Sequence, residues 1–332
     1  MQRFLRTIFV VLFLCIPLAV FLMWYFLVGF HSDAPGNTFN KDKNGIWLDH
    51  SWVDTDYPLE AIQTLGEELI DHDIRYVYLH TGPFESDGTI SPDKYPQAQF
   101  FLQEMHSQFP ELEWYAWIGQ LRSRVDLDDE QVRNEMLATV QTLVETIGFD
   151  GIHYNIEPVR PTEDEGFLNL LFETRLALFE TPISLATDEW QPEGLTGWAE
   201  DYFNIEIVSY WSTQDFEAVI PYVDQVVVMG YDTSLTKEDW YLWFLEQQVI
   251  YVTKAVEGSE VELLIGIPSY NSRENSETFD EKTENVKNGL LGVIQGLTNG
   301  RTVHDNFAGV AIYAYWETDS EEWRVYQELW QD

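Results

Sequence analysis

The chain has 332 residues, of which 18 are Lys or Arg and 57 are Asp or Glu, so its formal net charge is −39. A surface this acidic repels phosphate backbones, which excludes binding to nucleic acids through backbone contacts. The single cysteine, Cys15, excludes a disulfide framework and any metal site with several cysteine ligands. Hydrophobic residues make up 45% of the chain, enough for a large core, so we expect a folded protein that works at high salt or outside the cell.

Residues 1–30 form a long apolar segment whose only charged residues are Arg3 and Arg6. A helix over residues 7–30 is long enough to cross a hydrocarbon core of about 30 Å. A cleavable signal peptide would have a shorter apolar region followed by small residues, and a helix of the globular core needs no such length. We therefore expect a transmembrane anchor. The two arginines precede it, which predicts a cytoplasmic N-terminus and an extracytoplasmic location for the rest of the chain.

Residues 31–45 are rich in Gly, Asn, Asp and Lys and have no apolar period, which indicates a linker. From residue 46 to residue 332, short apolar runs alternate with longer amphipathic stretches. The expected strands are Gly45–Leu48, Ile74–Leu79, Leu112–Ile118, Gly151–Glu157, Ile183–Thr187, Gln225–Tyr231, Glu262–Ile267 and Gly309–Tyr315. The clearest helices between them are Leu59–Asp71, Asp129–Ile147, Asp164–Leu178, Lys237–Val256 and Asp280–Leu297.

Eight strand and helix units in about 290 residues predict an α/β fold of the (β/α)8 type, a TIM barrel. A doubly wound sheet is the alternative, but no glycine-rich phosphate-binding motif opens any of the helices. An additional short strand at Ile205–Tyr210 suggests an insertion after the fifth strand. Because the ligand sites of such barrels lie at the C-terminal ends of the strands, we expect the functional residues there.

The fourth strand carries an unusual row of polar residues. Side chains alternate along a strand, so His153, Asn155 and Glu157 share one face and apolar residues occupy the other. If the apolar face packs on the helices, the polar face points into the barrel, where polar groups need partners. The row could be a hydrogen-bond network that ties strands together, with His153 deep in the barrel. Alternatively Glu157, at the mouth, is a general acid whose neutral form burial favours.

Aromatic and acidic residues lie at the ends of other strands. The sixth ends in Met229-Gly230-Tyr231-Asp232, the seventh at Tyr270 and the eighth at Trp316-Glu317. Such aromatic groups, together with hydrogen-bonding side chains, suit the apolar faces and hydroxyls of a sugar. Further candidates for contact with substrate are Trp47 on the first strand and Trp117 on the third.

These motifs together resemble glycoside hydrolase family 18, which contains chitinases and endo-β-N-acetylglucosaminidases. The fourth strand is similar to the D-G-x-D-x-D-x-E signature of that family, the sixth to M-x-Y-D and the seventh to G-x-P-x-Y. The tryptophan after the eighth strand matches the one beneath the central sugar subsite. The residues that carry the resemblance are Asp150, Gly151, His153, Asn155, Glu157, Met229, Tyr231, Asp232, Gly266, Pro268, Tyr270 and Trp316.

The resemblance implies a retaining hydrolysis of N-acetylglucosamine-containing glycans, of the chitin, peptidoglycan or N-glycan type, without a cofactor or metal. Glu157 would protonate the glycosidic oxygen while the 2-acetamido group of the sugar attacks the anomeric carbon. Tyr231 would hydrogen-bond that acetamido group, and Trp316 would stack beneath the sugar. Asp150, His153, Asp232 and Tyr270 would complete the substrate-binding set.

The chain departs from the family pattern at its centre. His153 and Asn155 replace the middle acidic residues, and the third-strand region WYAWIGQ lacks the usual S-x-G-G. The Asn-x-Glu pairing resembles glycoside hydrolase family 85, in which an asparagine orients the acetamido group. An asparagine can hydrogen-bond that group but brings no charge to stabilise a cationic intermediate or to raise the pKa of Glu157. The sequence therefore indicates a divergent relative.

Several alternatives remain open on the sequence alone. Asp232 or Glu317 could act as a protein nucleophile beside Glu157, on sugars without an acetamido group. A non-catalytic glycan-binding lectin or scaffold at the cell surface is a second alternative. Asp188, after the fifth strand, could face the site or cap the next helix. A metal site at the rim is conceivable, but residues Asp49, His50 and His80 fit polar rim positions better.

Overall fold

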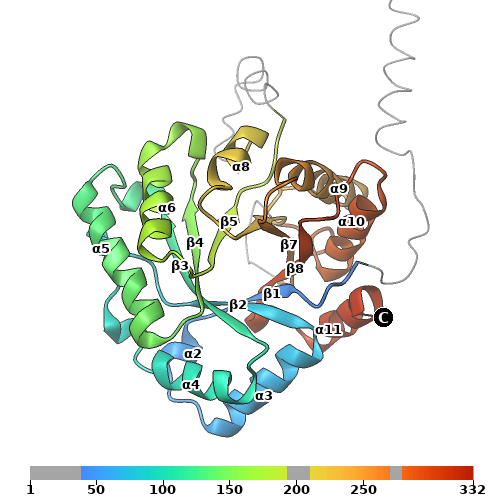
Figure 1. Ribbon diagram of the computed structural model, residues 1–332. Helices are drawn as coiled ribbons and strands as arrows, with labels where there is room; N and C mark the ends of the chain where they lie inside the picture. Colours follow the sequence, from blue (N-terminus) through green and yellow to red (C-terminus); the bar gives the residue numbers. More distant parts are fainter. Residues whose placement is uncertain (1–38, 193–209, 270–278, 332) are drawn as a thin grey trace, which may run out of the picture. The chain divides into compact units, whose positions relative to one another are not determined.

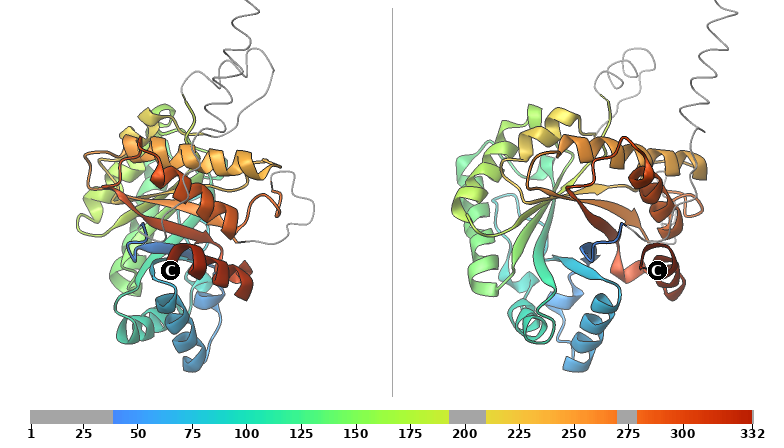
Figure 2. Two further views of the ribbon diagram at one scale, coloured as in Figure 1. Left: turned by 90° about the vertical axis from the view of Figure 1, so that its right-hand side faces the viewer. Right: turned by 45° about the vertical axis from the view of Figure 1, so that its right-hand side comes forward.

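The computed structural model describes residues 39–192, 210–269 and 279–331. The chain divides into two units, Met1–Pro35 and Gly36–Asp332, and all described residues belong to the second. In this unit eight parallel strands pair in sequence order and close into a barrel, with β8 hydrogen-bonded to β1. The helices lie around the outside of the strands (Figures 1 and 2). The predicted TIM barrel is thus confirmed.

The strands lie close to their predicted positions. The fourth and fifth have the predicted bounds, whereas β6 and β8 both end two residues earlier than expected. The residues after β8 form a 3₁₀ turn at Tyr315–Glu317, in which the N–H of Glu317 bonds the carbonyl of Ala314. The strand bounds are β1 Asn44–Leu48, β2 Ile74–His80, β3 Glu113–Leu121, β4 Gly151–Glu157, β5 Ile183–Thr187, β6 Gln225–Met229, β7 Glu262–Pro268 and β8 Phe307–Tyr313.

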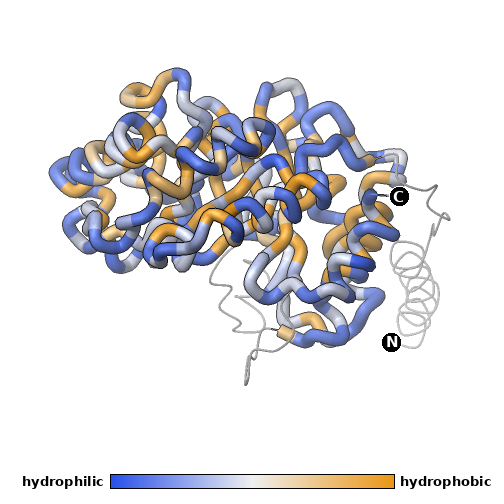
Figure 3. Tube along the Cα trace, turned by 90° about the horizontal axis from the view of Figure 1, so that it is seen from below, coloured by the Kyte–Doolittle hydropathy of each residue, from blue (hydrophilic) through white to orange (hydrophobic). Residues whose placement is uncertain are grey.

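The helices are amphipathic, and apolar and polar residues alternate along their traces in Figure 3. The predicted helix over residues 129–147 begins as an α-helix and finishes as a π-helix, Thr142–Ile147. Four of the described α-helices, α2, α4, α8 and α11, were not among those expected. The helix bounds are α2 Ser51–Asp54, α3 Leu59–Asp71, α4 Ala98–Gln108, α5 Glu130–Gln141, α6 Glu165–Ala177, α8 Thr213–Val219, α9 Glu238–Ala255, α10 Val286–Thr298 and α11 Ser320–Tyr326.

Two apolar layers hold the barrel together. Between strands and helices the core is mainly Ile, Leu, Val and Phe. Inside the barrel it is largely aromatic, in place of the branched aliphatic residues that usually fill such barrels: Trp47, Tyr76, Tyr78, Tyr115 and Trp117. Gly151 makes room for one of these rings, because a Cβ there would lie 2.5 Å from an atom of the Tyr115 ring.

Two predictions fall on residues that the structure does not describe. The first is the membrane anchor at residues 1–30, which stays a prediction. Among the described residues 39–331, with their two gaps, no helix has both the length and the apolar character that crossing a membrane requires. The expected inserted strand at Ile205–Tyr210 also lies outside the described residues except for its last residue.

Candidate active site

The two faces of β4 lie as its alternation predicts. The apolar face packs on the helical layer, where the hydroxyl of Tyr154 is 2.9 Å from that of Thr174 on α6. The polar face points into the barrel and carries His153, Asn155 and Glu157 in order toward the C-terminal end. The sequence pattern therefore places Asn155 and Glu157 at the mouth of the barrel.

His153 lies below the mouth, fully buried, in a hydrogen-bond network across the barrel. Its Nε2 accepts from the indole N–H of Trp47 (3.2 Å), and its Nδ1 lies 2.8 Å from the Ser184 hydroxyl. That hydroxyl donates to Gln225, so it accepts from Nδ1–H, which defines a neutral tautomer. Burial lowers the pKa of His153 to about 3. The expected deep position is confirmed, but substrate contact by His153 is a wrong prediction, because no surface of its side chain is exposed.

Above this network lies a cavity of about 310 Å³ at the C-terminal ends of β4, β5, β6 and β8. Its walls combine four carboxyl groups with two phenol rings and an amide, and none of the described residues that line it is basic. The lining residues are Asn155, Glu157, Asp188, Glu189, Met229, Tyr231, Asp232 and Tyr313.

The cavity changes the protonation state of Glu157. Burial, and then the negative charge of Asp188, raise its pKa to about 7. A hydrogen bond from the side chain of Asn155 opposes this shift in part. The Oδ1 atom of Asn155 is buried and has no hydrogen-bond partner among the described residues. The pair therefore offers a proton donor at neutral pH and, beside it, an empty acceptor.

The structure places Asp188, whose position the sequence left open, at the cavity. The next helix among the described residues, α8, is capped by Ser212 in a capping box with Asp215. Asp188 instead lines the cavity and is only 7% exposed. Glu189 also lines it, and burial raises the pKa of Glu189 to about 7. Glu189 was not among the predicted site residues, because no motif marks that position.

Aromatic rings form one wall of the cavity. Tyr231, a predicted site residue, stacks on Tyr313 with ring centroids 4.9 Å apart and planes inclined by 14°. Trp47 meets both rings edge-on from beneath. Trp316 is not among the residues that line the cavity: it lies on the turn after β8, is 41% exposed and meets the edge of Tyr313. The prediction that Trp316 floors the site is wrong, and Tyr313 holds the comparable place.

The loop after β6 is fixed by Glu284, which was not among the predicted site residues. The carboxylate of Glu284, just before α10, accepts the backbone N–H groups of Asp232 (2.7 Å) and Thr233 (3.0 Å). It also accepts the Thr233 hydroxyl at 2.7 Å. Asp232 has a φ of 58°, so its position in the cavity depends on this anchor. The partners are about 50 residues apart in the chain, and no local pattern signals the contact.

Three further predicted residues lie elsewhere. Trp47 is buried beneath the cavity, where it donates to His153, and does not line it. Trp117 packs with ring centroids 4.7 Å from His80 and 6.3 Å from Tyr313, beside the cavity. Tyr270 lies outside the described residues.

Asp150 is at the wrong end of the barrel for substrate binding. Its carboxylate accepts the backbone N–H of Trp114 at 2.8 Å and lies 3.0 Å from a ring nitrogen of His106. It precedes β4 and is separated from Glu157 by the whole strand, about 20 Å. The prediction for Asp150 is therefore wrong, because it joins β4 to β3 and α4 at the N-terminal end.

Other acidic and histidine candidates give no second site at the rim. Glu317 is exposed on the turn after β8 and does not line the cavity, which removes it as a nucleophile. The rings of His50 and His80 are 5.8 Å apart, and burial lowers the pKa of His80 to about 4. Within the described ranges no group of three or more His, Cys, Asp or Glu could hold a metal ion.

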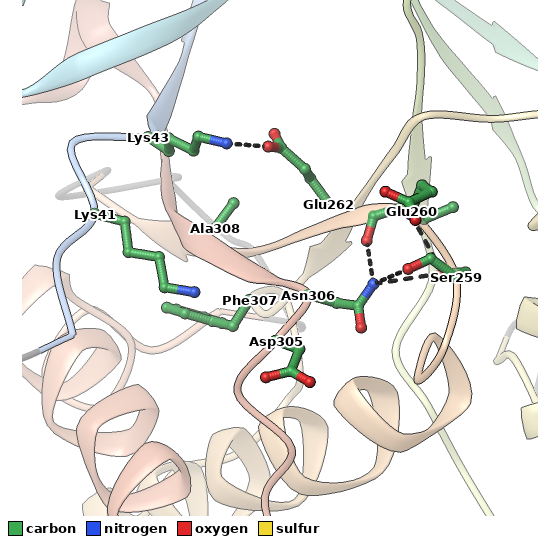
Figure 4. Close-up of a pocket in the computed structure, with 10 residues that line it drawn as sticks. Lys41, Lys43, Ser259, Glu260, Glu262, Asp305, Asn306, Phe307 and Ala308 are labelled. Carbon is green, nitrogen blue, oxygen red and sulfur yellow. Dashed lines mark hydrogen bonds and ion pairs between the residues drawn. The ribbon is translucent and has the colours of Figure 1, made fainter.

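A second cavity of about 340 Å³ lies at the N-terminal ends of β7 and β8 (Figure 4). Lys43 points to Glu262, with which it forms an ion pair, and the hydroxyl of Tyr76 donates to the same carboxylate. The amide of Asn306 bonds the carbonyls of Ser259 and Val261. These polar groups satisfy one another and close the base of the barrel, so we assign this cavity a structural role.

Comparison with known proteins identifies the fold. No protein-family model and no curated protein matches the chain. Solved structures do match: a chitinase from Chromobacterium violaceum at 13% identity, over 86% of this chain and 98% of that one, with a TM-score of 0.58. A GH18 chitinase from Cycas revoluta in complex with (GlcNAc)3 matches at 14% identity, over 87% of this chain and 99% of that one, with a TM-score of 0.58. The Bacillus cereus spore cortex-lytic enzyme SleL matches at 12% identity, over 89% of this chain and 76% of that one, with a TM-score of 0.58. The chain thus has a barrel fold similar to that of the family 18 chitinases.

Proposed function

We propose that the protein is a glycoside hydrolase that cleaves N-acetylglucosamine-containing glycans with help from the acetamido group of the substrate. The observation that carries the proposal is the Asn155–Glu157 pair, a neutral acid and an empty buried acceptor in one aromatic-walled cavity. The fold shared with the chitinases and with SleL supports this substrate class. Which of these glycans it cleaves is left to the assay.

In the first step Glu157 gives its proton to the glycosidic oxygen, and the bond between that oxygen and the anomeric carbon breaks. The carbonyl oxygen of the 2-acetamido group bonds to the same carbon, which forms a cationic oxazolinium ring. Asn155 Oδ1 accepts the N–H of the acetamido group, and the Tyr231 hydroxyl donates to its oxygen. Both groups hold the nucleophile in position, which converts its attack into an intramolecular reaction.

In the second step a water molecule attacks the anomeric carbon from the face that the leaving group vacated. The Glu157 carboxylate takes one proton from this water, and the oxazolinium ring opens to restore the acetamido group. The product keeps the anomeric configuration, and Glu157 returns to its protonated form. A pKa of about 7 suits a residue that acts as acid and then as base near neutral pH.

A glycan-binding protein without catalysis is the alternative function. Loss of the family aspartates motivates it, since an uncharged Asn155 stabilises a cation less well than a carboxylate does. The position of Glu157 beside Asn155 in the cavity, together with its raised pKa, supports hydrolysis, because a lectin needs no proton donor there.

The test is an assay of the purified chain on chitooligosaccharides, peptidoglycan fragments and N-glycans, with Glu157→Gln as the variant. We expect kcat to fall by a factor of about 100 to 10,000, as removal of a general acid does. Binding of the same oligosaccharide should change little, because Gln keeps the shape of Glu. Hydrolysis that Glu157→Gln leaves intact would sink the assignment, and binding by the wild type without turnover would favour the lectin.

We further propose that residues 1–30 anchor the chain in a membrane, with the barrel on the extracytoplasmic side. The uncharged run over residues 7–30 and the two preceding arginines support this proposal. A surface-exposed barrel would meet polymeric glycans directly.

A further inference from the structure

The third strand carries a hydrogen-bond donor that the fold itself leaves unused. The indole N–H of Trp117 is buried and has no hydrogen-bond partner among the described residues, and the Trp117 side chain is only 9% exposed. An unpaired buried N–H destabilises a fold, so each one in a native structure calls for an explanation. A ligand that accepts this hydrogen bond would remove the cost on binding.

The register of β3 directs this donor toward the mouth of the barrel. Trp117 pairs with His153 on β4. Two residues later Gly119 pairs with Asn155, whose side chain lines the cavity. The indole nitrogen of Trp117 lies 3.8 Å from the position that a Cβ of Gly119 would take. The indole ring therefore rises along the barrel wall and brings its N–H to the level of Asn155.

The space in front of the indole nitrogen is open because residue 119 has no side chain. Among the described residues only two atoms lie within 4 Å of a Cβ at Gly119, the Trp117 Nε1 at 3.8 Å and the Asn155 backbone oxygen at 4.0 Å. Gly119 is also partly exposed, so a ligand can reach this position. The unused acceptor, Asn155 Oδ1, lies on the adjacent strand, about 4.8 Å away across the sheet. A single sugar ring spans such a separation.

The aromatic rings next to Trp117 are uncharged at neutral pH. His80 pairs with Trp117 from β2, and their ring centroids lie 4.7 Å apart. Burial lowers the pKa of His80 to about 4, so its ring is neutral at pH 7. The ring of Tyr313, which lines the cavity, lies 6.3 Å from the indole. A neutral oxygen acceptor suits these surroundings.

A second unpaired indole on the same strand shows what distinguishes Trp117. Trp114 also has a buried N–H without a partner among the described residues, but its ring meets Phe101 of α4 edge-on in the helical layer. That face of β3 points away from the cavity. Trp117 instead lies inside the barrel, beside the open position at Gly119. The two tryptophans therefore form a matched pair for experiment.

We propose that the indole N–H of Trp117 donates a hydrogen bond to a hydroxyl oxygen of the sugar whose acetamido group Asn155 holds. This inference rests on the proposed function, in which Tyr231 serves the acetamido oxygen, so a hydroxyl is the acceptor left for Trp117. The contact moves no proton and is present before and during the reaction. Trp117 is therefore a residue for binding the substrate and not for the bond-breaking step.

The test compares Trp117→Phe with Trp114→Phe on the full-length chain in detergent micelles. Each substitution removes one unpaired indole N–H and keeps an aromatic ring. N-acetylchitotriose is the probe, and calorimetry is done in a Glu157→Gln background so that the probe is not cleaved. For Trp117→Phe we expect the affinity to fall by about 5- to 30-fold, as loss of one hydrogen bond does. Trp114→Phe is the matched control and should change the affinity by less than about twofold, since its N–H faces the helices.

A second variant keeps the indole and closes the space in front of it. In Gly119→Ala the new methyl group lies at ordinary van der Waals distance from its two neighbours, so the fold should tolerate it. The methyl group occupies the place of the sugar oxygen, and we expect a loss of affinity of about fivefold or more. This variant tests the proposal even where Trp117→Phe does not fold.

The indole resonance gives a readout that a purely structural role would not change. In a chain with isotope-labelled tryptophan, the indole N–H signal absent from Trp117→Phe should shift when the probe is added and should exchange more slowly with water. The signal absent from Trp114→Phe should do neither. With Glu157 intact, Trp117→Phe should raise KM with little change in kcat, because the contact is equal in the ground state and the transition state.

Equal losses of affinity in Trp117→Phe and Trp114→Phe would overturn the inference while hydrolysis stands. A Trp117 signal that the probe does not shift would also overturn it and would leave the N–H to a water molecule. Probe binding that depends on Trp117, found without turnover by the wild type, would support the inference and contradict the hydrolase. A chain that does not bind the probe would overturn both.

Discussion

At the residue scale, the site is built on a polar network that needs a neutral histidine. His153 accepts from Trp47 and donates to Ser184, so a protonated ring would lose one bond and carry a buried charge. This network supports the floor of the cavity, since Trp47 also packs against Tyr231 and Tyr313. The function of the rim therefore depends on the protonation state of a residue that never meets substrate.

The pKa of His153 predicts a loss of stability in acid. Its pKa is about 3 in the folded chain against 6.5 when unfolded, so below pH 6.5 the unfolded chain binds the extra proton. The contribution of neutral His153 to the free energy of unfolding is fully present above pH 6.5 and is lost as the pH falls toward 3. At pH 5 the loss is about 2 kcal/mol. Urea unfolding at pH 7 and at pH 5 measures this loss of unfolding free energy. Between pH 7 and pH 5 the His153→Gln variant, whose side chain does not titrate, should lose about 2 kcal/mol less unfolding free energy than the wild type.

An identical pH dependence in His153→Gln would contradict this prediction. The comparison between variants is needed because buried carboxyl groups act in the opposite sense. Glu157, Glu189 and Glu284 have pKa values raised to about 7, so they destabilise the folded chain as the pH rises above their unfolded value of 4.5.

Sequence alternation predicted some of these residues and failed for others on identifiable grounds. Asn155 and Glu157 were found because they share the polar face of a strand that ends at the rim. Trp316 was misplaced because a 3₁₀ turn begins before it, which the apolar run does not reveal. Asp188 was undecided because aspartate suits both a helix cap and a site. Asp150 was misplaced because the match to the signature does not show which end of the strand meets substrate.

At the scale of elements, all eight strands were predictable from composition and period, and most bounds held within two residues. Strands buried on both faces leave an unmistakable apolar run. Helices such as α4 and α8 were not expected, since α8 has only seven residues and α4 has mixed polar and apolar positions. The interior of the barrel was not predictable, because its aromatic filling depends on which rings meet across it.

A substitution at Gly151 tests how tightly the aromatic rings pack inside the barrel. It opens β4, and a Cβ there would lie 2.5 Å from the Tyr115 ring and 2.8 Å from the carbonyl oxygen of Pro182. Gly151→Ala should therefore cost about 1–3 kcal/mol of unfolding free energy, because neither neighbour can yield without moving a strand. Gly300→Ala is the matched control, since nothing lies within 4 Å of its Cβ, and it should stay within about 0.5 kcal/mol. Equal stabilities of the two variants in denaturant would show that the ring can move aside.

At the scale of the whole molecule, charge and membrane attachment are linked. The net charge is −39, and the only charges in residues 1–30 are positive, so the acidic residues all lie beyond that segment. Anionic lipid head groups repel such a surface, and screening by salt weakens this repulsion but does not turn it into attraction. The net charge of the chain therefore does not attract it to such a membrane, and we expect the proposed attachment to depend on the apolar segment.

This argument predicts the result of fractionation. The full-length chain should sediment with membranes and resist extraction at high salt and at alkaline pH, because hydrophobic insertion is insensitive to both. A chain of residues 31–332 should be recovered in the supernatant at 0.05 M and at 1 M salt. Protease added from the outer side should digest the barrel of the full-length chain in intact cells. A truncated chain that sediments at low salt but not at high salt would reveal an electrostatic attachment, and a soluble full-length chain would contradict the anchor.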